Sequence, residues 1–136
     1  MAFTATTAYT VFDTKTVNAN SKGFSRGVFD GRYIYFVPLN NGNVFGQVTR
    51  YNTTLSLTSA GSYAVFDTST VNIASKGCYC GLYDGRYVYF VAGSPTSGTY
   101  GGAGSYALFD TATVSVASKG FSGGVFDGRY IYCIPN

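Results

Sequence analysis

The feature that most constrains this chain is a segment that occurs three times and aligns without gaps. The copies are FDTKTVNANSKGFSRGVFDGRYIYFVP, FDTSTVNIASKGCYCGLYDGRYVYFVA and FDTATVSVASKGFSGGVFDGRYIYCIP, which begin at Phe12, Phe66 and Phe109. A repeat of this kind is typical of folds in which each unit buries its apolar face against the next unit. We therefore treat residues 1–136 as a single repeat domain, with units at about residues 9–52, 63–100 and 106–135.

Each copy contains an Asp-Gly pair between two apolar runs, which is a strong signal for a β-hairpin. The pairs are Asp30-Gly31, Asp84-Gly85 and Asp127-Gly128. We expect type I′ turns at these pairs, because Asp-Gly tolerates the positive φ that such turns need at both central residues. The run after each turn, RYIYFV in the first copy, is apolar or aromatic at alternate and intervening positions alike. Such a strand is expected to be covered on both faces.

Two further kinds of strand are expected outside the hairpins. The segments AYTVFDT, SYAVFDT and SYALFDT predict one outer strand per unit, and GQVTRYNTT predicts a strand that is present only between the first two copies. The composition agrees, because 18% of residues are aromatic and such residues favour strands. The order of the elements predicts that the N-terminal YTVFDT strand joins the sheet of the last hairpin, in the same chain or in a partner.

The order of hairpin, RYN strand and FDT strand resembles the blades of β-propellers of the kelch and NHL type. More closely, it resembles bacterial repeat proteins that carry FDGRYVYFVP followed by RYDT. The resemblance covers nearly the whole chain, and it implies an antiparallel repeat fold. This sequence departs from it in lacking the kelch Gly-Gly and Trp signals as a set, and in keeping the RYN strand in one unit only.

The sequence thus predicts an all-β, three-repeat, pseudo-threefold antiparallel sheet assembly, and it leaves two architectures open. Three sheets could pack as a β-prism-like monomer within one chain. Alternatively, the chain could supply three blades of a β-propeller that is completed by dimerisation, because propellers typically have 4–8 blades. The first needs no partner, whereas the second makes the protein a homo-oligomer.

The reactive side chains argue against an enzyme. The chain has no His and no Glu, which removes the commonest general base and the usual catalytic triads. All six carboxylates are Asp residues at recurring turn positions, in DGR or in FDT, where an Asp side chain bonds the nearby backbone. No unit carries an additional acid. We therefore expect these aspartates to be structural and the protein to have no catalytic residue, cofactor or metal.

Cysteines and charges give little further chemistry. Cys78 and Cys133 stand where other copies have Phe, so together with Cys80 they predict buried thiols, with a disulfide from Cys133 left open. The net charge is +3, but the basic residues do not cluster into a basic stripe, so the sequence does not indicate nucleic-acid binding. The recurring arginines could pair with recurring aspartates across the sheet. No stretch is long and apolar enough to span a membrane.

Two functional classes remain. The first is a non-enzymatic, multivalent glycan-binding module, lectin-like, that uses the loops before each hairpin. Its expected ligand-binding residues are Asn18, Ser21, Lys22, Asn72, Ser75, Lys76, Ser118 and Lys119. The alternative is a structural, self-assembling surface protein, such as a virion decoration or fibre subunit. No secretory signal is visible, and the sequence leaves the location open between a virion or extracellular site reached after lysis and, otherwise, the cytoplasm.

Overall fold

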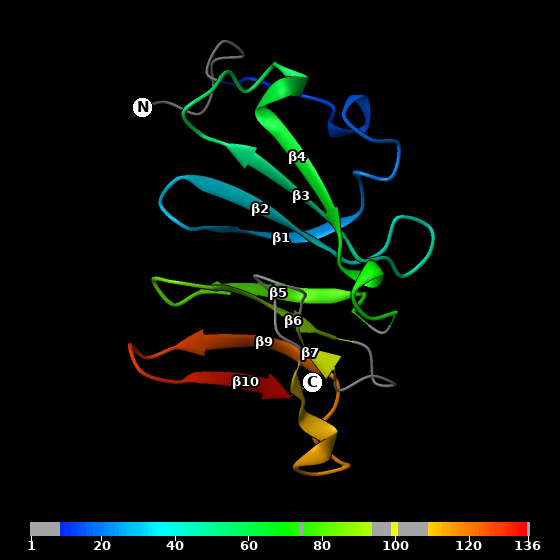
Figure 1. Cartoon of the computed structure of the whole chain (residues 1–136), viewed down its shortest axis with the longest axis vertical. Coiled ribbons are helices and arrows are strands. Elements are labelled where there is room, and N and C mark those ends of the chain that lie inside the picture. Colours follow the sequence, from blue (N-terminus) through cyan, green and yellow to red (C-terminus); the bar gives the residue numbers. More distant parts are fainter. Residues whose placement is uncertain (1–8, 74, 94–98, 101–108, 136) are drawn as a thin grey trace.

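The computed structural model confirms an all-β chain built from antiparallel strands (Figure 1). It describes residues 9–73, 75–93, 99–100 and 109–135. Short 3-10 turns η2 to η5 are the helical elements in these ranges: Thr14–Thr16, Ala60–Ser62, Thr68–Thr70 and Thr111–Thr113. The strands are β1 (Phe24–Phe29), β2 (Tyr33–Pro38), β3 (Gln47–Asn52), β4 (Tyr63–Asp67), β5 (Cys78–Tyr83), β6 (Val88–Ala92), β7 (Thr99–Tyr100), β8 (Phe109–Asp110), β9 (Phe121–Phe126) and β10 (Ile131–Pro135).

The three predicted hairpins are the pairs β1–β2, β5–β6 and β9–β10. The first hairpin is extended by β3 and β4 into a sheet of order β1-β2-β3-β4, so GQVTRYNTT and SYAVFDT form the strands expected of them. The second repeat has a counterpart of this extension in the short antiparallel pair β7–β8. A strand after the hairpin is therefore not confined to the first unit, which corrects the sequence prediction. The segment GSPTSGTYGGAG that follows the second hairpin has no sequence similarity to the GQVTRYNTT segment that follows the first, so the sequence did not indicate β7.

The hairpins turn at the predicted places but with a different geometry. Asp30 N–H donates to the Tyr33 carbonyl at 3.1 Å, so the central residues are Gly31 and Arg32 rather than Asp30 and Gly31. Gly31 has φ +99°, and no non-glycine residue in the described ranges has positive φ. A type I′ turn needs positive φ at both central residues, and here only the glycine has it, so the type I′ prediction was wrong. The same bond and the same glycine conformation recur in the other two hairpins.

The three hairpins stack face to face in series, with β5 lying between β1 and β9 (Figure 1). Small residues allow this close approach. A Cβ atom built on Gly81 of β5 would lie only 2.8 Å from Val28 Cγ1 and 3.0 Å from Val37 Cγ2 of the first sheet. Because Gly81 has no side chain, the two valines can occupy the space where its Cβ atom would otherwise be. Val37 is fully buried and Val28 half-buried at this position, and their burial stabilises the stack through the hydrophobic effect.

The second interface of the stack repeats the first. A Cβ atom on Gly124 of β9 would lie 2.7 Å from Leu82 Cδ1 and 3.7 Å from Val91 Cγ2. Cys80 and Phe121 complete a buried cluster with Val91 at this interface. Sheets two and three therefore meet in the same way as sheets one and two, as the repeated sequence requires.

The described residues 9–13 of the N-terminal AYTVFDT segment form no strand, contrary to the prediction, and the segment does not join the last hairpin within the chain. Phe12 instead stacks on Tyr63 of β4, with the ring centroids 4.6 Å apart. This segment lies beside the first sheet, at the opposite end of the stack from β9–β10 (Figure 1). The prediction that the N-terminal segment pairs with the last hairpin of the same chain was therefore wrong. Stacking of Phe12 on Tyr63 holds the segment near the first sheet instead. Pairing with a partner stays a prediction.

Candidate functional site

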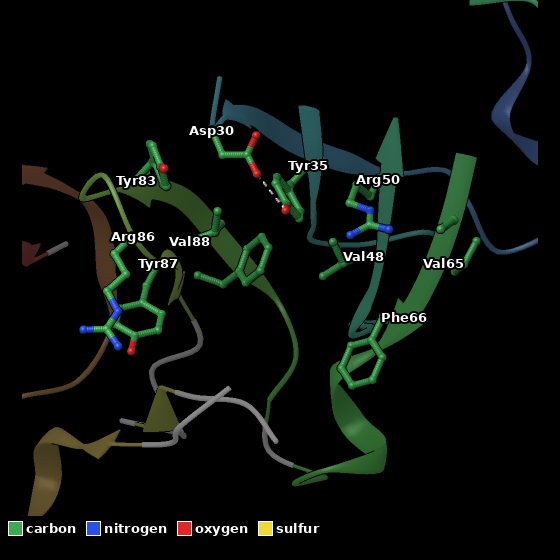
Figure 2. A pocket seen from close by; sticks show the side chains of 12 residues that line it. Asp30, Tyr35, Val48, Arg50, Val65, Phe66, Tyr83, Arg86, Tyr87 and Val88 are labelled. Atoms are coloured by element: carbon green, nitrogen blue, oxygen red, sulfur yellow. Dashed lines mark hydrogen bonds between the residues drawn. The ribbon is translucent and has the colours of Figure 1, made fainter. Parts of the chain in front are cut away.

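A cleft of about 550 Å³ opens between the first sheet and the β5–β6 hairpin (Figure 2). Its volume lies within the range of small-molecule sites. One wall comes from the first hairpin, β3 and β4, and the other from the second hairpin. The residues that line it are Asp30, Tyr35, Val48, Arg50, Ala64, Val65, Phe66, Tyr83, Arg86, Tyr87, Val88 and Phe90.

The polar centre of the first wall is Asp30, whose carboxylate is held by three hydrogen bonds. Its Oδ1 accepts from the Arg32 N–H at 2.8 Å and the Tyr33 N–H at 2.6 Å, and its Oδ2 accepts from the Tyr35 hydroxyl at 2.9 Å. Partial burial opposes ionisation of Asp30, but the bonds from Tyr33, Arg32 and Tyr35 outweigh it and lower its pKa. Asp30 is therefore a fixed anion that orders the turn and the Tyr35 ring.

Arg50 of β3 stands next to this pair on the same wall. Its guanidinium carbon lies 4.2 Å from the centre of the Tyr33 ring, a cation–π arrangement. Arg32 lies over the same ring at 5.1 Å but does not line the cleft. Figure 2 shows Asp30 and Arg50 on either side of the Tyr35 side chain. Burial raises the pKa of Tyr35, as does the Asp30 carboxylate, while Arg50 acts in the opposite direction.

The opposite wall is mainly apolar and aromatic. Val88 and Phe90 of β6 contribute its apolar part. Tyr83 of β5 also lines this wall, and its hydroxyl donates to the Gly85 carbonyl at 2.8 Å. The cleft therefore places a ring-rich surface opposite a cation and hydrogen-bonding groups. Such a combination suits a ligand that has both an apolar face and polar substituents.

The loops before the hairpins, where the sequence placed the ligand site, share one internal hydrogen bond. Thr14 Oγ1 donates to the Ser21 carbonyl at 2.6 Å, and Thr68 and Thr111 make the same bond to Ser75 and Ser118. The bond closes each loop on itself. It explains why Thr recurs at this position in every copy, since the acceptor is a backbone carbonyl and the donor is the Thr side chain.

The predicted serines are largely structural. Ser21 is 0% exposed, and its Oγ accepts a hydrogen bond from Thr49 Oγ1 at 2.8 Å. Ser75 is also buried. A ligand in solvent cannot reach these two hydroxyls, because the loop has folded them against the sheet. Ser118 is half-buried, which leaves the third copy less enclosed.

The other predicted residues differ in how far they are exposed to solvent. Lys22 and Lys119 are exposed, whereas Asn18, Asn72 and Lys76 are half-buried. Asn18 Oδ1 accepts from the Asn20 N–H at 2.9 Å, so this side chain is engaged within its own loop. None of the eight predicted residues lines the larger cleft. Their side chains therefore do not form one common site with it.

One predicted residue does line a second, smaller cavity of about 190 Å³. Lys76 shares that cavity with Asn20 of the first loop and with Gln47 of β3. Gln47 Oε1 is buried and has no hydrogen-bond partner among the described residues. The first two loops therefore meet here, although the third loop, with Ser118 and Lys119, lies elsewhere in the stack (Figure 1).

The sequence did not single out the residues of the larger cleft. Arg50 carried the available signal, because it is one of three basic residues outside the repeated positions. The recurring arginines also differ from expectation. Arg86 and Arg129 lie over the rings of Tyr87 and Tyr130, at 4.8 and 4.9 Å, rather than against aspartates. The aspartates already have backbone and tyrosine partners, so the rings accommodate the cations.

Cysteine chemistry is structural in the described part of the chain. Cys78 and Cys80 are buried thiols, as predicted, whereas Cys133 is only half-buried, so the prediction was wrong for that residue. Cys133 forms no disulfide with either of the other two. Burial raises the pKa of Cys78 to about 12, which keeps it protonated at neutral pH. No cluster of three or more potential metal-ligating residues is present among the residues described. Within those same ranges, no helix is long and apolar enough to cross a membrane.

The hydrogen-bonded aspartate in each hairpin turn predicts that the protein is sensitive to acid. We call this aspartate, with the tyrosine N–H and hydroxyl groups that donate to it, the Asp-Tyr clamp; in the second hairpin these are Asp84, Tyr87 and Tyr89. Hydrogen bonds from Tyr87 and Tyr130 N–H groups head the causes that lower the pKa of Asp84 and Asp127, and Asp30 is lowered as well. Because the folded state favours the ionised form, this stabilisation is present above the ordinary pKa of 3.8 and is lost as pH falls through the lowered values. Urea midpoints measured between pH 7 and pH 2 should therefore decrease below about pH 4.

The matched control for this pH dependence is Asp84→Asn. The amide cannot titrate, so the variant should be less stable at pH 7 and should lose less stability on acidification than the unmodified chain. Equal acid dependence of the two proteins would show that the clamp carboxylates do not carry the effect.

Comparison with known proteins gives no family to which the chain can be assigned. No protein-family model matches it. Searches of curated proteins and of solved structures also gave no match. The resemblance to kelch-like and NHL-like repeats therefore rests on the sequence motifs alone.

Proposed function

We propose that the protein is a non-enzymatic glycan-binding module and that the cleft between the first sheet and β5–β6 is its principal site. The observation that carries this proposal is the juxtaposition of Arg50 with the Asp30–Tyr35 pair, opposite the apolar wall of Val88 and Phe90. Sugars present C–H faces that pack against such walls and hydroxyls that bond to guanidinium and phenol groups. The proposal inherits the lectin-like prediction but moves its site away from the repeated loops.

The charge of the cleft favours an acidic sugar. Arg50 and Arg86 line it, and Asp30 is the one carboxylate among the lining residues. Because Asp30 already accepts three hydrogen bonds within its hairpin, it is poorly available to sugar hydroxyls. A sugar carboxylate would form charge-assisted bonds with a guanidinium, which are stronger than neutral ones. We therefore infer uronate- or sialate-containing glycans as the ligand class.

The same geometry supports binding without hydrolysis. Glycoside hydrolysis usually employs two carboxyl groups, one of them held protonated by a raised pKa. The lining of this cleft supplies one carboxyl group, and its pKa is lowered. Asp30 is therefore poorly suited to act as a general acid at neutral pH.

The test is titration calorimetry with oligogalacturonate and sialyllactose as probes, compared with neutral cello-oligosaccharides. Arg50→Gln should weaken acidic-glycan binding about tenfold or more, because it removes one charge-assisted interaction. The matched control is Arg32→Gln. Arg32 lies over the same Tyr33 ring but outside the cleft, so its replacement should leave affinity within about twofold.

A second variant separates this site from the predicted loop site. Replacing Lys22, Lys76 and Lys119 together leaves Arg50 and the cleft lining unchanged. If the triple variant loses binding while Arg50→Gln retains it, the repeated loops bind the glycan and the cleft does not. If none of the probes binds, the glycan proposal fails.

The alternative function, a structural and self-assembling surface protein, is favoured by a separate observation. Large apolar side chains are exposed on the described part of the third hairpin, including Val125, Tyr132 and Ile134. Exposed apolar surface of this kind is typical of contact regions. Assembly through this surface would be independent of glycan binding.

A further inference from the structure

We propose that two copies of this chain associate end to end, with the third hairpin of each copy packed on the first sheet of the other. The proposal does not depend on glycan binding. It follows from the two interfaces between neighbouring hairpins inside the chain. Each of these interfaces joins a glycine on one hairpin to an apolar pair on the hairpin before it, and the two ends of the chain expose one such glycine and one such pair. The contact residues at the ends are Gly27 on β1 and Val125 and Ile134 on β9–β10.

The interfaces inside the chain define what fits against what. In each, a glycine of one hairpin receives two apolar side chains of the hairpin before it. Gly81 receives Val28 and Val37 at the first interface. Gly124 receives Leu82 and Val91 at the second, and the two sets occupy equivalent repeat positions.

The receiving half of this interface is open at the first sheet. Gly27 is the repeat equivalent of Gly81 and Gly124. A Cβ atom built on it would meet only Ile34 Cγ2 at 3.6 Å and the Tyr35 carbonyl at 3.8 Å, both of its own hairpin. Gly27 is exposed. Among the described residues, no preceding sheet covers it.

The inserting half is open at the third hairpin. Val125 and Ile134 are the repeat equivalents of Leu82 and Val91. They are 52% and 49% exposed, whereas Val37 and Val91, which insert inside the chain, are 0% and 2% exposed. The chain therefore presents an apolar pair at one end and the glycine that accepts such a pair at the other.

The N-terminal segment supports the same arrangement. Phe12 is the repeat equivalent of Phe66, which belongs to the outer strand β4 and lines the cleft facing the second hairpin. Phe12 lies against Tyr63 of the first sheet. The segment is therefore the repeat equivalent of the outer strand β4, and no hairpin precedes it among the described residues. A second copy would supply that hairpin as β9–β10.

We expect the ring to contain two copies of the chain. Head-to-tail contacts form rings when the rotation closes and filaments when it does not. Propeller-like rings typically contain 4–8 sheets. One chain offers three stacked hairpins, so two chains make six, which lies within that range. Both contacts of such a ring repeat the interfaces that the chain already contains.

Sedimentation velocity over a concentration series tests the proposal directly. The unmodified chain should sediment with twice the mass of one chain. Ile134→Asp should shift the species to a single chain or weaken the dimer about a hundredfold, because it places a charge in an apolar contact. Gly27→Val should do the same from the other side, by filling the receiving position.

The matched control is Ile73→Asp, which alters an exposed isoleucine in a loop and should leave the dimer intact. Mixing the Ile134→Asp and Gly27→Val chains should restore a weaker dimer, because one of the two contacts then has both halves unaltered. Circular dichroism and the melting transition show whether each variant is folded. Gly27→Val keeps the test decisive if Ile134→Asp fails to fold.

Several results would overturn the proposal. A monomer at every concentration would do so, as would a dimer that survives both substitutions. Open polymers that grow with concentration would replace the two-chain ring with a filament. A dimer that is restored no better in the mixture than in either variant alone would contradict the head-to-tail arrangement.

Discussion

Replacing Gly23 with alanine should destabilise the protein by more than about 3 kcal/mol, enough to unfold a domain of marginal stability. Gly23 has φ +73°, which disfavours any residue with a side chain. A Cβ atom there would also lie 1.9 Å from the Asn40 carbonyl oxygen. The backbone cannot easily move away, because the Gly23 carbonyl accepts from the Leu39 and Asn40 N–H groups. Urea denaturation followed by circular dichroism measures the effect.

The matched control is Gly31→Ala. Gly31 has φ +99°, but nothing lies within 4 Å of the position that its Cβ would occupy. It should therefore show the backbone penalty alone, about 1–2 kcal/mol. Equal losses for the two variants would mean that the contact with Asn40 relaxes, and the predicted steric effect would then be wrong.

Replacing Gly81 with valine should separate or strain the first two sheets. Its Cβ alone would lie 2.8 Å from Val28 Cγ1 and 3.0 Å from Val37 Cγ2, and Val37 is fully buried. Overfilling of a packed interior typically costs about 1–3 kcal/mol. We expect a loss toward the upper end of that range, because the valine would add three carbons between two sheets that are already in contact. The free energy of unfolding from urea titration measures this.

Gly27→Val provides the comparison for this prediction. The position is equivalent in the repeat, but the nearest atom to its Cβ is Ile34 Cγ2 at 3.6 Å. Measured at dilutions where both variants are monomeric, Gly27→Val should be less damaging than Gly81→Val by at least about 1 kcal/mol. If the two substitutions cost the same, the contact between the first two sheets does not depend on the glycine.

The repeated sequence predicted the strands well because local signals and burial agree in every copy. The Asp-Gly pairs located all three hairpins, and the FDT segment after Tyr63 formed β4 as expected. The apolar position of Cys78 correctly indicated a buried thiol, whereas Cys133, at an equally apolar position, is only half-buried. These features depend on short-range pattern, which a sequence displays directly.

The site and the stacking depended on relations between distant segments, and these were harder to predict. Ser21 looks like a surface loop residue, yet it bonds to Thr49 after the chain has folded back across the sheet. Arg50 becomes part of the cleft only because β3 pairs with β2 and faces the second hairpin. The position of Phe12 was decided by its stacking on Tyr63, which no local pattern indicates.

The alternation of a glycine with an apolar pair along the stack has a consequence for how such a chain can change in length. Each hairpin contacts its sequential neighbours through the same small set of side chains, at Gly81 and again at Gly124. In stacks of this kind, the stability approximates a sum of unit and nearest-neighbour contributions. A duplicated copy of the gene segment would therefore arrive with both halves of its contact already encoded. The chain could gain or lose a unit in one genetic step without any compensating substitution in the units that remain.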